Sequence, residues 1–213
     1  MVTVISLLVL IAQAGGPPPI PPVQRIVEGR TLVSKDLPAA TFHFSRPFRY
    51  VGSQVVRLYG NADAEQHLFV VAGRSGSVRK FYWIQFEHFL PTNQMSYDYA
   101  PTRTTDTGKL RFIYDVRSLS DYGSMHVDPV SDSAAIRRLL AAHGLQFPER
   151  VARVRMFFLP TADRRSELMM IYGEALPANT DIPMGEDGVD LDGAAPAAAR
   201  SVLEHARGSL RIE

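Results

Sequence analysis

The segment FYWIQFEHFL, residues 81–90, constrains the fold of this chain more than any other stretch. Successive side chains of a β-strand point to opposite faces of its sheet, and bulky apolar side chains occupy both alternating sets here. One set comprises Phe81, Trp83, Gln85, Glu87 and Phe89, and the other comprises Tyr82, Ile84, Phe86, His88 and Leu90. Such a strand needs a cover on each face, which predicts a central strand of a layered domain.

Period-two alternation of apolar and polar residues predicts an antiparallel sheet around this strand. The turn GRSGS, residues 73–77, would close a hairpin that places Leu68 on the face of Trp83, and Phe69 on the face of Tyr82. Seven strands are expected: one around Phe42 and Phe44, and others over residues 50–59, 67–71, 79–90, 110–116, 152–158 and 168–172.

Two segments have helical spacing of apolar residues. The first would begin at a Ser131 or Asp132 cap and end before Gly144, and the second would run from about Ala195 to Ala206. We therefore expect an α+β fold: a single layered domain with a mostly antiparallel sheet of about seven strands. One helix is inserted before the last two strands, and another lies at the C-terminus.

The first 14 residues, MVTVISLLVLIAQA, predict a cleavable export signal. An apolar run precedes Ala12 and Ala14, which are small residues of the kind that signal peptidase accepts, and this run is shorter than the roughly 20 residues needed to span a bilayer. No lysine or arginine precedes it, so a misassigned start or a stray hydrophobic tail is the alternative. We expect a secreted or periplasmic protein with no stable membrane span after cleavage.

Composition divides the remaining chain and excludes several chemistries. Residues 15–30 form a proline-rich linker, residues 31–176 the antiparallel domain, residues 177–194 an acidic linker, and residues 195–213 the C-terminal helix and tail. The chain has no cysteine, which rules out disulfides and thiol chemistry. A formal net charge of +1 does not favour nucleic acid as a partner. No cofactor is expected.

Strand alternation also tests the most obvious catalytic pair. Glu87 and His88 are adjacent in the sequence, so they point to opposite faces and cannot form a dyad. A carboxylate on an aromatic face needs a partner, and Arg57 is the expected one. The alternative is that burial raises the pKa of Glu87 and makes this residue a general acid.

Metal sites have little support in the sequence. His43, His67 and His88 fall on three expected strands and would bind zinc only if their faces converged, and no short histidine spacing supports that arrangement. The acidic segment at residues 181–193 resembles a calcium loop in composition but lacks the required carboxylates, so weak calcium binding is a minor alternative. No metal is therefore expected.

Two long loops, residues 91–109 and 117–129, predict a binding surface. The first would lie at the same end of the sheet as residues 60–66. The candidate ligand-binding residues are Asn61, Asp63, Trp83, Tyr97, Asp98 and Tyr99. Tyrosine combines apolar area with a hydroxyl, which suits a sugar, a peptide or a protein surface, although an ordinary polar loop would have the same composition.

Three functions are compatible with these features. The first is an exported, non-catalytic binding or interaction domain whose partner is an unknown small ligand, peptide or envelope protein. The second is a secreted or periplasmic hydrolase that uses the carboxylate of Glu87 or Asp98 in acid/base chemistry. The third is a structural envelope protein. Titratable groups that converge in a concave pocket would favour the enzyme over the other two.

Overall fold

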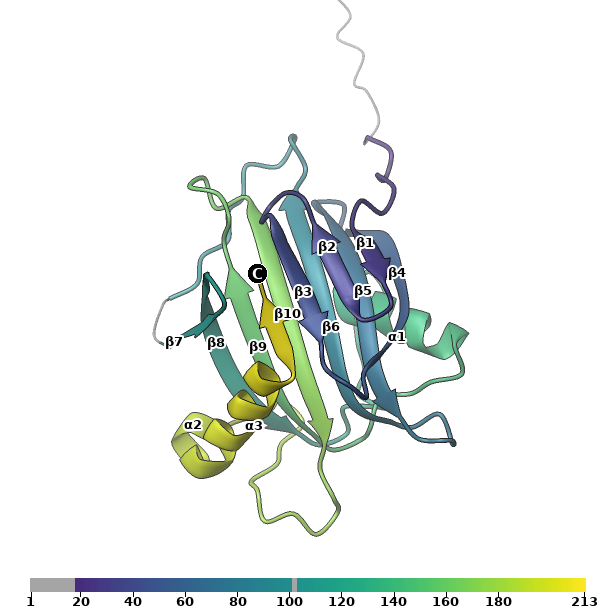
Figure 1. Ribbon diagram of the computed structural model, residues 1–213, viewed down its shortest axis with the longest axis vertical. Coiled ribbons are helices and arrows are strands. Elements are labelled where there is room, and N and C mark those ends of the chain that lie inside the picture. The colour runs from purple at the N-terminus through teal and green to yellow at the C-terminus, as the bar shows by residue number, and fades with distance from the viewer. Residues whose placement is uncertain (1–17, 101–102) are drawn as a thin grey trace, which may run out of the picture.

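The computed structural model describes residues 18–100 and 103–213, which form two antiparallel sheets and three helices (Figure 1). The larger sheet has the strand order β11-β8-β9-β10-β6-β5-β4, with β7 also paired to β8, and the smaller sheet has the order β1-β2-β3-β12. The sheet-rich α+β class is confirmed. The structure has twelve strands where about seven were expected.

The strands of the larger sheet are β4 (Arg49–Leu58), β5 (Ala62–Ala72), β6 (Val78–Phe89), β7 (Thr104–Thr107), β8 (Leu110–Leu119), β9 (Val151–Phe158), β10 (Ser166–Ala175) and β11 (Val189–Asp190). The smaller sheet contains β1 (Ile26–Glu28), β2 (Thr31–Ser34), β3 (Ala40–Phe44) and β12 (Leu210–Ile212). The helices are α1 (Asp132–Ala142), α2 (Leu191–Ala194) and α3 (Pro196–Gly208).

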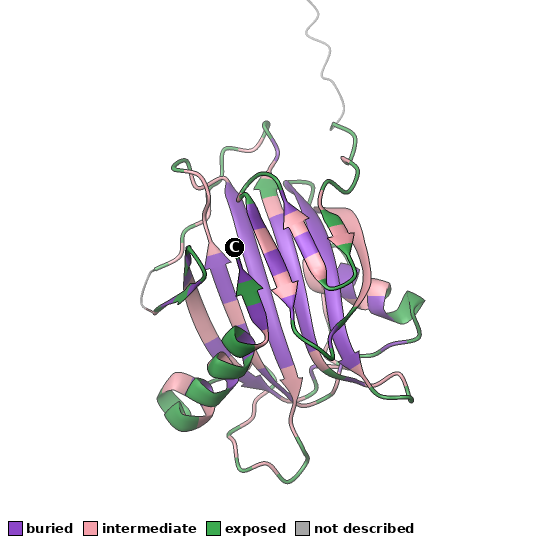
Figure 2. Cartoon of the chain, viewed as in Figure 1, coloured by how far each residue is buried: buried purple, intermediate pink, exposed green. Residues whose placement is uncertain are grey.

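Strand β6 is central and buried on both faces, as its sequence predicts. It lies between β5 and β10, and Trp83 pairs with Leu68 on one side and with Ile171 on the other. Tyr82 pairs with Phe69, so the expected hairpin register is confirmed, with one irregularity next to the turn. Figure 2 shows that buried residues run almost the full length of these central strands.

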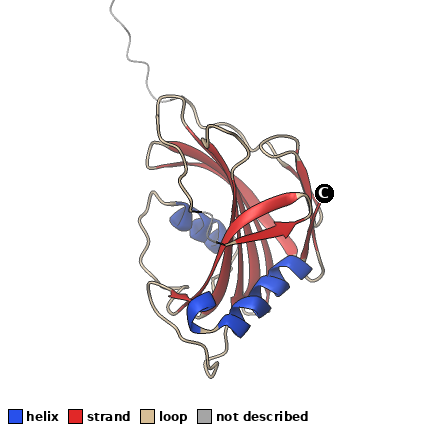
Figure 3. Ribbon diagram, turned by 90° about the vertical axis from the view of Figure 1, so that its left-hand side faces the viewer, coloured by secondary structure: helices blue, strands red, loops and turns tan. Residues whose placement is uncertain are grey.

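Two layers cover the larger sheet, one on each face (Figure 3). The smaller sheet and α3 pack on one face, where Phe44 stacks on Phe69 with ring centroids 3.8 Å apart. Helix α1 packs on the other face, where Ile136 and Leu140 contribute to one cluster with Trp83. The side chains of both alternating sets from Phe81 to Phe86 are thus removed from water, which explains the two-sided apolar sequence of β6.

Local signals set the ends of both long helices. The Ser131 side chain accepts a hydrogen bond from the backbone N–H of Ala134, and Gly144, with φ of +65°, follows the end of α1. Helix α3 begins with Pro196 and extends to Gly208, two residues beyond the expected end. The inserted helix and the helix near the C-terminus are therefore both present, but four strands, β9 to β12, follow α1 where two were expected, and α2 was not expected.

Five short strands were not expected from the sequence: β1, β2, β7, β11 and β12. Each has only two to four residues, too few to show a clear alternation, and each is ordered by pairing with a longer or distant partner. Strand β12 pairs with β3 from the other end of the chain. The segment 177–194, expected as a linker, includes β11 and α2, and its Leu191 is buried.

The predicted export signal, residues 1–14, lies outside the described residues. From Pro18 onward the proline-rich segment is attached to the larger sheet, because Arg57 donates a hydrogen bond to the Pro18 carbonyl. The backbone N–H groups of Gln24 and Arg25 each donate to the carboxylate of Glu65 over 2.9 Å. Among the described residues, no helix is both long enough and apolar enough to cross a membrane.

Candidate functional site

A band of polar side chains crosses the α1 face of the larger sheet, next to the apolar patch that α1 covers. Gln66 on β5 and Gln85 on β6 are fully buried and lie directly opposite each other. Glu87 follows on β6, and Glu167 on β10 lies directly opposite it. Since cross-strand partners share a face, two carboxyl groups meet here beside the apolar patch that α1 covers.

A chain of hydrogen bonds orients Glu87. The indole N–H of Trp83 donates to Oε1 of Gln85 over 3.2 Å, and Nε2 of Gln66 donates to the same oxygen over 2.9 Å. Nε2 of Gln85 then donates to Oε2 of Glu87 over 2.7 Å. The hydroxyl of Tyr97 donates to the other oxygen, Oε1, over 2.6 Å. Both oxygens of Glu87 therefore have partners.

The loop that follows β6 folds back over this polar band. The rings of Tyr97 and Tyr99 are half-buried in a continuous stack: Tyr97 lies 4.6 Å from Phe89, and Tyr99 lies 4.5 Å from Phe157, between ring centroids. Nε of Arg164 donates to the Tyr97 carbonyl over 2.8 Å and holds the loop in place. Both tyrosines are thus packed against the sheet, whereas a position near the surface was expected.

A cavity of about 430 Å³ lies between the loop, the sheet and the start of α1. Its size falls within the range of small-molecule sites. Its polar lining includes Glu87, Tyr97, Tyr99, Asp132, Arg155 and Glu167.

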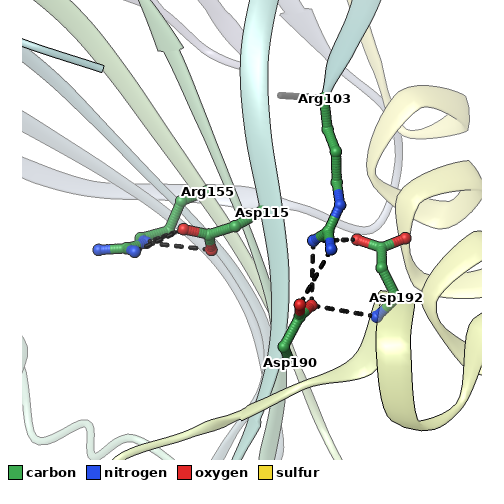
Figure 4. A network of polar contacts seen from close by, with 5 residues as sticks. All are labelled: Arg103, Asp115, Arg155, Asp190 and Asp192. Atoms are coloured by element: carbon green, nitrogen blue, oxygen red, sulfur yellow. Dashed lines mark hydrogen bonds and ion pairs between the residues drawn. The ribbon is translucent and has the colours of Figure 1, made fainter. Parts of the chain in front are cut away.

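One ion pair limits the positive charge in this cavity. Arg155 on β9 forms hydrogen bonds to both carboxylate oxygens of Asp115 on β8, with Nε lying 3.0 Å from Oδ2 (Figure 4). Figure 4 also shows a second ion-pair network, in which Arg103 binds Asp190 and Asp192. The positive charge of Arg155 is therefore balanced by its own carboxylate partner.

Burial changes the protonation of the carboxyl pair. Burial raises the pKa of Glu167 to about 8; hydrogen bonding to Tyr99 opposes this rise, and the negative charge of Glu87 adds to it. Burial also raises the pKa of Glu87, against the hydrogen bonds from Tyr97 and Gln85. Glu167 is only 3% exposed, and its buried Oε2 has no hydrogen-bond partner among the described residues. At neutral pH the pair holds a proton.

The structure brings four of the expected site residues together, because Glu87, Tyr97, Asp98 and Tyr99 all line the cavity. Asp98 lies at its exposed edge, with 96% of its side chain accessible. Asn61 instead lines a smaller hollow that shares Glu87 with the cavity.

Two other expected site residues do not line the cavity. The carboxylate of Asp63 points to the opposite face, where Nε of Arg57 donates to it over 2.8 Å. Arg57 is therefore not the partner of Glu87, because the two side chains lie on opposite faces of the sheet. Trp83 is 1% exposed and forms part of the hydrophobic core, so its contribution to the cavity is indirect, through Gln85.

The three histidines do not converge. His43 lies in the smaller sheet beside Thr31, His67 is buried next to Glu65, and His88 is exposed on β6. Within residues 18–100 and 103–213, no group of three or more histidine, aspartate or glutamate side chains is arranged to hold a metal ion. The zinc alternative is therefore not supported by these residues.

Sequence reasoning missed Asp115, Asp132, Arg155 and Glu167. Glu167 directly precedes the expected strand 168–172, so the sequence pattern does not place it in the sheet, whereas β10 begins at Ser166. A usable signal was present: Glu167 has the same parity as Met169 and Ile171, which places a carboxyl group on a buried face. Its position opposite Glu87 depends on the pairing of β10 with β6, which the local pattern does not specify.

The chain matches no known protein family, and no curated protein or solved structure is similar to it at a significant level. The geometry of the cavity is therefore the basis for a functional assignment.

Proposed function

We propose that this protein is an exported, non-catalytic binding domain that holds a small polar molecule in the cavity between β6, β10 and the Tyr97–Tyr99 loop. The observation that carries the proposal is the cross-strand carboxyl pair of half-buried Glu87 and buried Glu167, in which Oε2 of Glu167 has no partner among the described residues. A buried polar atom without a partner costs about 1 to 3 kcal/mol. A ligand that donates a hydrogen bond to this oxygen would offset that cost.

The loop supports the same proposal. Tyr97 and Tyr99 place aromatic rings and hydroxyl groups at the cavity, and the Tyr97 backbone is held by Arg164 from the segment before β10. Rigid aromatic side chains lose little conformational entropy when a ligand binds, so they suit a preformed recognition site.

A hydrolase is the second candidate, because the raised pKa values of Glu87 and Glu167, caused by burial, would suit a general acid. Two carboxyl groups of different protonation are the usual arrangement for glycoside hydrolysis. None of the side chains that line the cavity in the described chain is a histidine, so catalysis would depend on these carboxyl groups and the tyrosines.

Native mass spectrometry of protein purified from its own host tests the binding proposal. We expect a bound small molecule on the unmodified protein, and its loss from the double variant Tyr97→Phe/Tyr99→Phe, which keeps the stacked rings and removes both hydroxyls. Tyr50→Phe, on the opposite face beside Phe69, is the matched control and should keep the bound molecule. The double variant loses the hydrogen bond from Tyr97 to Glu87, so its free energy of unfolding should fall by about 1 to 3 kcal/mol, whereas Tyr50→Phe should stay within about 0.5 kcal/mol of the unmodified protein.

A different outcome would favour the enzyme. If the purified protein carries no small molecule but hydrolyses a glycoside or ester, and Glu87→Gln or Glu167→Gln abolishes that turnover, the hydrolase replaces the binding domain. If the protein shows neither a bound molecule nor turnover, both proposals lose their support and the structural envelope role gains it.

A further inference from the structure

We infer that the ligand of this cavity is a small organic cation, and that its binding releases one proton from the Glu87–Glu167 pair. This inference rests on the proposed binding function and specifies its ligand class. Three features support it: the excess of carboxyl groups in the cavity, a buried acceptor oxygen without a partner among the described residues, and the surroundings that keep a proton on the carboxyl pair.

Carboxyl groups outnumber basic groups among the side chains that line the cavity. Five line it: Glu87, Asp98, Asp115, Asp132 and Glu167. The one arginine among the lining residues is Arg155, and it is committed to Asp115. A neutral polyol can donate hydrogen bonds to these carboxyl groups but has no charge to be attracted by their excess, whereas a cation is attracted by every unpaired carboxylate.

Oε2 of Glu167 is the second, independent observation. It is a buried acceptor for which residues 18–100 and 103–213 provide no donor, in a side chain that lines the cavity and is almost completely enclosed. Ammonium and guanidinium groups carry only donors, so they match an acceptor-rich cavity better than hydroxyl or amide groups do. Hydrogen bonds to charged groups are also stronger than neutral ones.

Every element that faces Glu167 contributes a charged or titratable group. Helix α1 contributes Asp132, β6 contributes Glu87, β8 contributes Tyr114 and Asp115, β9 contributes Arg155, and the loop contributes Tyr97, Asp98 and Tyr99. Burial is the largest cause of the raised pKa of Glu167, about 8; Glu87 and Asp132 raise it further, and Tyr99 and Arg155 oppose them. The carboxyl pair of the free protein therefore keeps a proton at neutral pH, and an incoming cation would favour its release to solvent.

The same surroundings favour an organic cation over a metal ion. Both oxygens of Glu87 are already engaged by Gln85 and Tyr97, and the described residues offer no three-ligand group for a metal. The cavity also has apolar walls, including Phe157 and Met169, which an alkyl or guanidinium group can contact.

Isothermal titration calorimetry with matched probes tests this inference. Methylguanidinium is a cation with N–H donors, choline is a cation whose charged group has none, and neither titrates near neutral pH. N-methylurea and 3,3-dimethylbutan-1-ol are the neutral molecules of similar shape. We expect the cations to bind at least about tenfold more tightly than their neutral counterparts. Titrations at pH 7 in phosphate and in MOPS, which differ in ionisation enthalpy and carry no net positive charge, should show close to one proton released per cation, because a Glu167 pKa of about 8 leaves this carboxyl mostly protonated in the free protein.

The pH dependence adds a readout that a merely structural role would not produce. The ionised fraction of a group of pKa about 8 rises about tenfold between pH 7 and pH 9, so methylguanidinium affinity should rise about tenfold over this interval. Glu167→Gln resembles the protonated carboxyl in shape and charge, and it should abolish both the proton release and the pH dependence. Glu174→Gln, on the other face of β10 where Glu174 contacts Lys80, is the matched control and should bind methylguanidinium as the unmodified protein does.

The outcomes separate this inference from the proposed function. Neutral probes or glucose that bind as tightly as the cations, or calcium that binds alone, would overturn the cation assignment and leave the binding function standing. Cations that bind with no proton release would overturn the role of the carboxyl pair. No binding of any probe, together with no molecule on the protein from its host, would contradict both proposals.

Discussion

Trp83 connects the hydrophobic core to the cavity. Its ring is buried in the cluster beneath α1, and its indole N–H donates to Gln85, which in turn donates to Glu87. The only tryptophan of the chain therefore has two roles, in packing and in orienting the amide that holds a site carboxylate. A single substitution can separate these roles.

Trp83→Ala should lower the free energy of unfolding by about 3 to 5 kcal/mol, because it removes a large side chain from a closely packed strand. Urea denaturation followed by circular dichroism measures this loss, since the variant has no tryptophan fluorescence. Trp83→Phe keeps most of the apolar volume, so its free energy of unfolding should fall by less than that of Trp83→Ala. A loss below about 1 kcal/mol for the alanine variant would show that the strand is not packed as described.

At the scale of elements, α1 both covers the core and delivers Asp132 to the cavity. Its start is set by Ser131, whose Oγ lies 3.1 Å from the backbone N of Ala134. The apolar face of the helix then fits over Trp83 and Leu68. Because Asp132 is the first residue of the helix, the cap that orders the first turn also positions this carboxylate.

Ser131→Ala should lower the free energy of unfolding by about 1 kcal/mol, because the cap hydrogen bond is lost and the first turn of α1 is weakened. Ser133→Ala is the matched control. The Ser133 hydroxyl donates a hydrogen bond to the neighbouring Asp132, so removing it should lower the free energy of unfolding by less than about 0.5 kcal/mol. If urea denaturation gives the same decrease in the free energy of unfolding for both variants, Ser131 does not stabilise α1 as a cap.

At the scale of the whole molecule, Glu65 joins the N-terminal segment to the larger sheet. Its carboxylate accepts hydrogen bonds from two backbone N–H groups and from the Arg25 guanidinium, and it lies 2.7 Å from Nε2 of His67. Burial alone would raise the pKa of Glu65, but the contact with His67 and the bonds from Gln24 and Arg25 lower it to about 2. The folded state therefore favours the ionised carboxylate.

This shift predicts how stability depends on pH. A carboxyl group whose pKa is depressed on folding stabilises the folded state above its unfolded pKa, here 4.5, and this contribution is lost as the pH falls to about 2. Glu65→Gln should lose about 3 kcal/mol at pH 7, because it leaves Arg25 without its buried partner. Between pH 4.5 and 2, the difference in stability between the unmodified protein and this variant should shrink.

Urea titrations at several pH values check this expectation, with Glu28→Gln as an exposed control on β1. A stability difference that stays constant from pH 7 to pH 2 would show that the Glu65 carboxylate does not tie the N-terminal segment to the sheet through its charge.

The sequence by itself determined the features that depend on neighbouring residues. Alternation along residues 81–90 identified a strand buried on both faces, and together with the turn at residues 73–77 it predicted the pairing of Trp83 with the Leu68 face. The same alternation separated Glu87 from His88. Capping residues located α1. These features are local, because side-chain direction in a strand and the ends of a helix depend on adjacent backbone geometry.

The tertiary structure alone decided which distant residues meet. The carboxyl pair exists because β10 lies beside β6, and the short strands β1 and β12 join one sheet although they come from opposite ends of the chain. Arg57 has the right charge to bind Glu87 but lies on the other face, whereas Tyr97 reaches Glu87 because its loop folds back over the sheet. Long-range pairing depends on the total packing of both faces, so no local pattern specifies it.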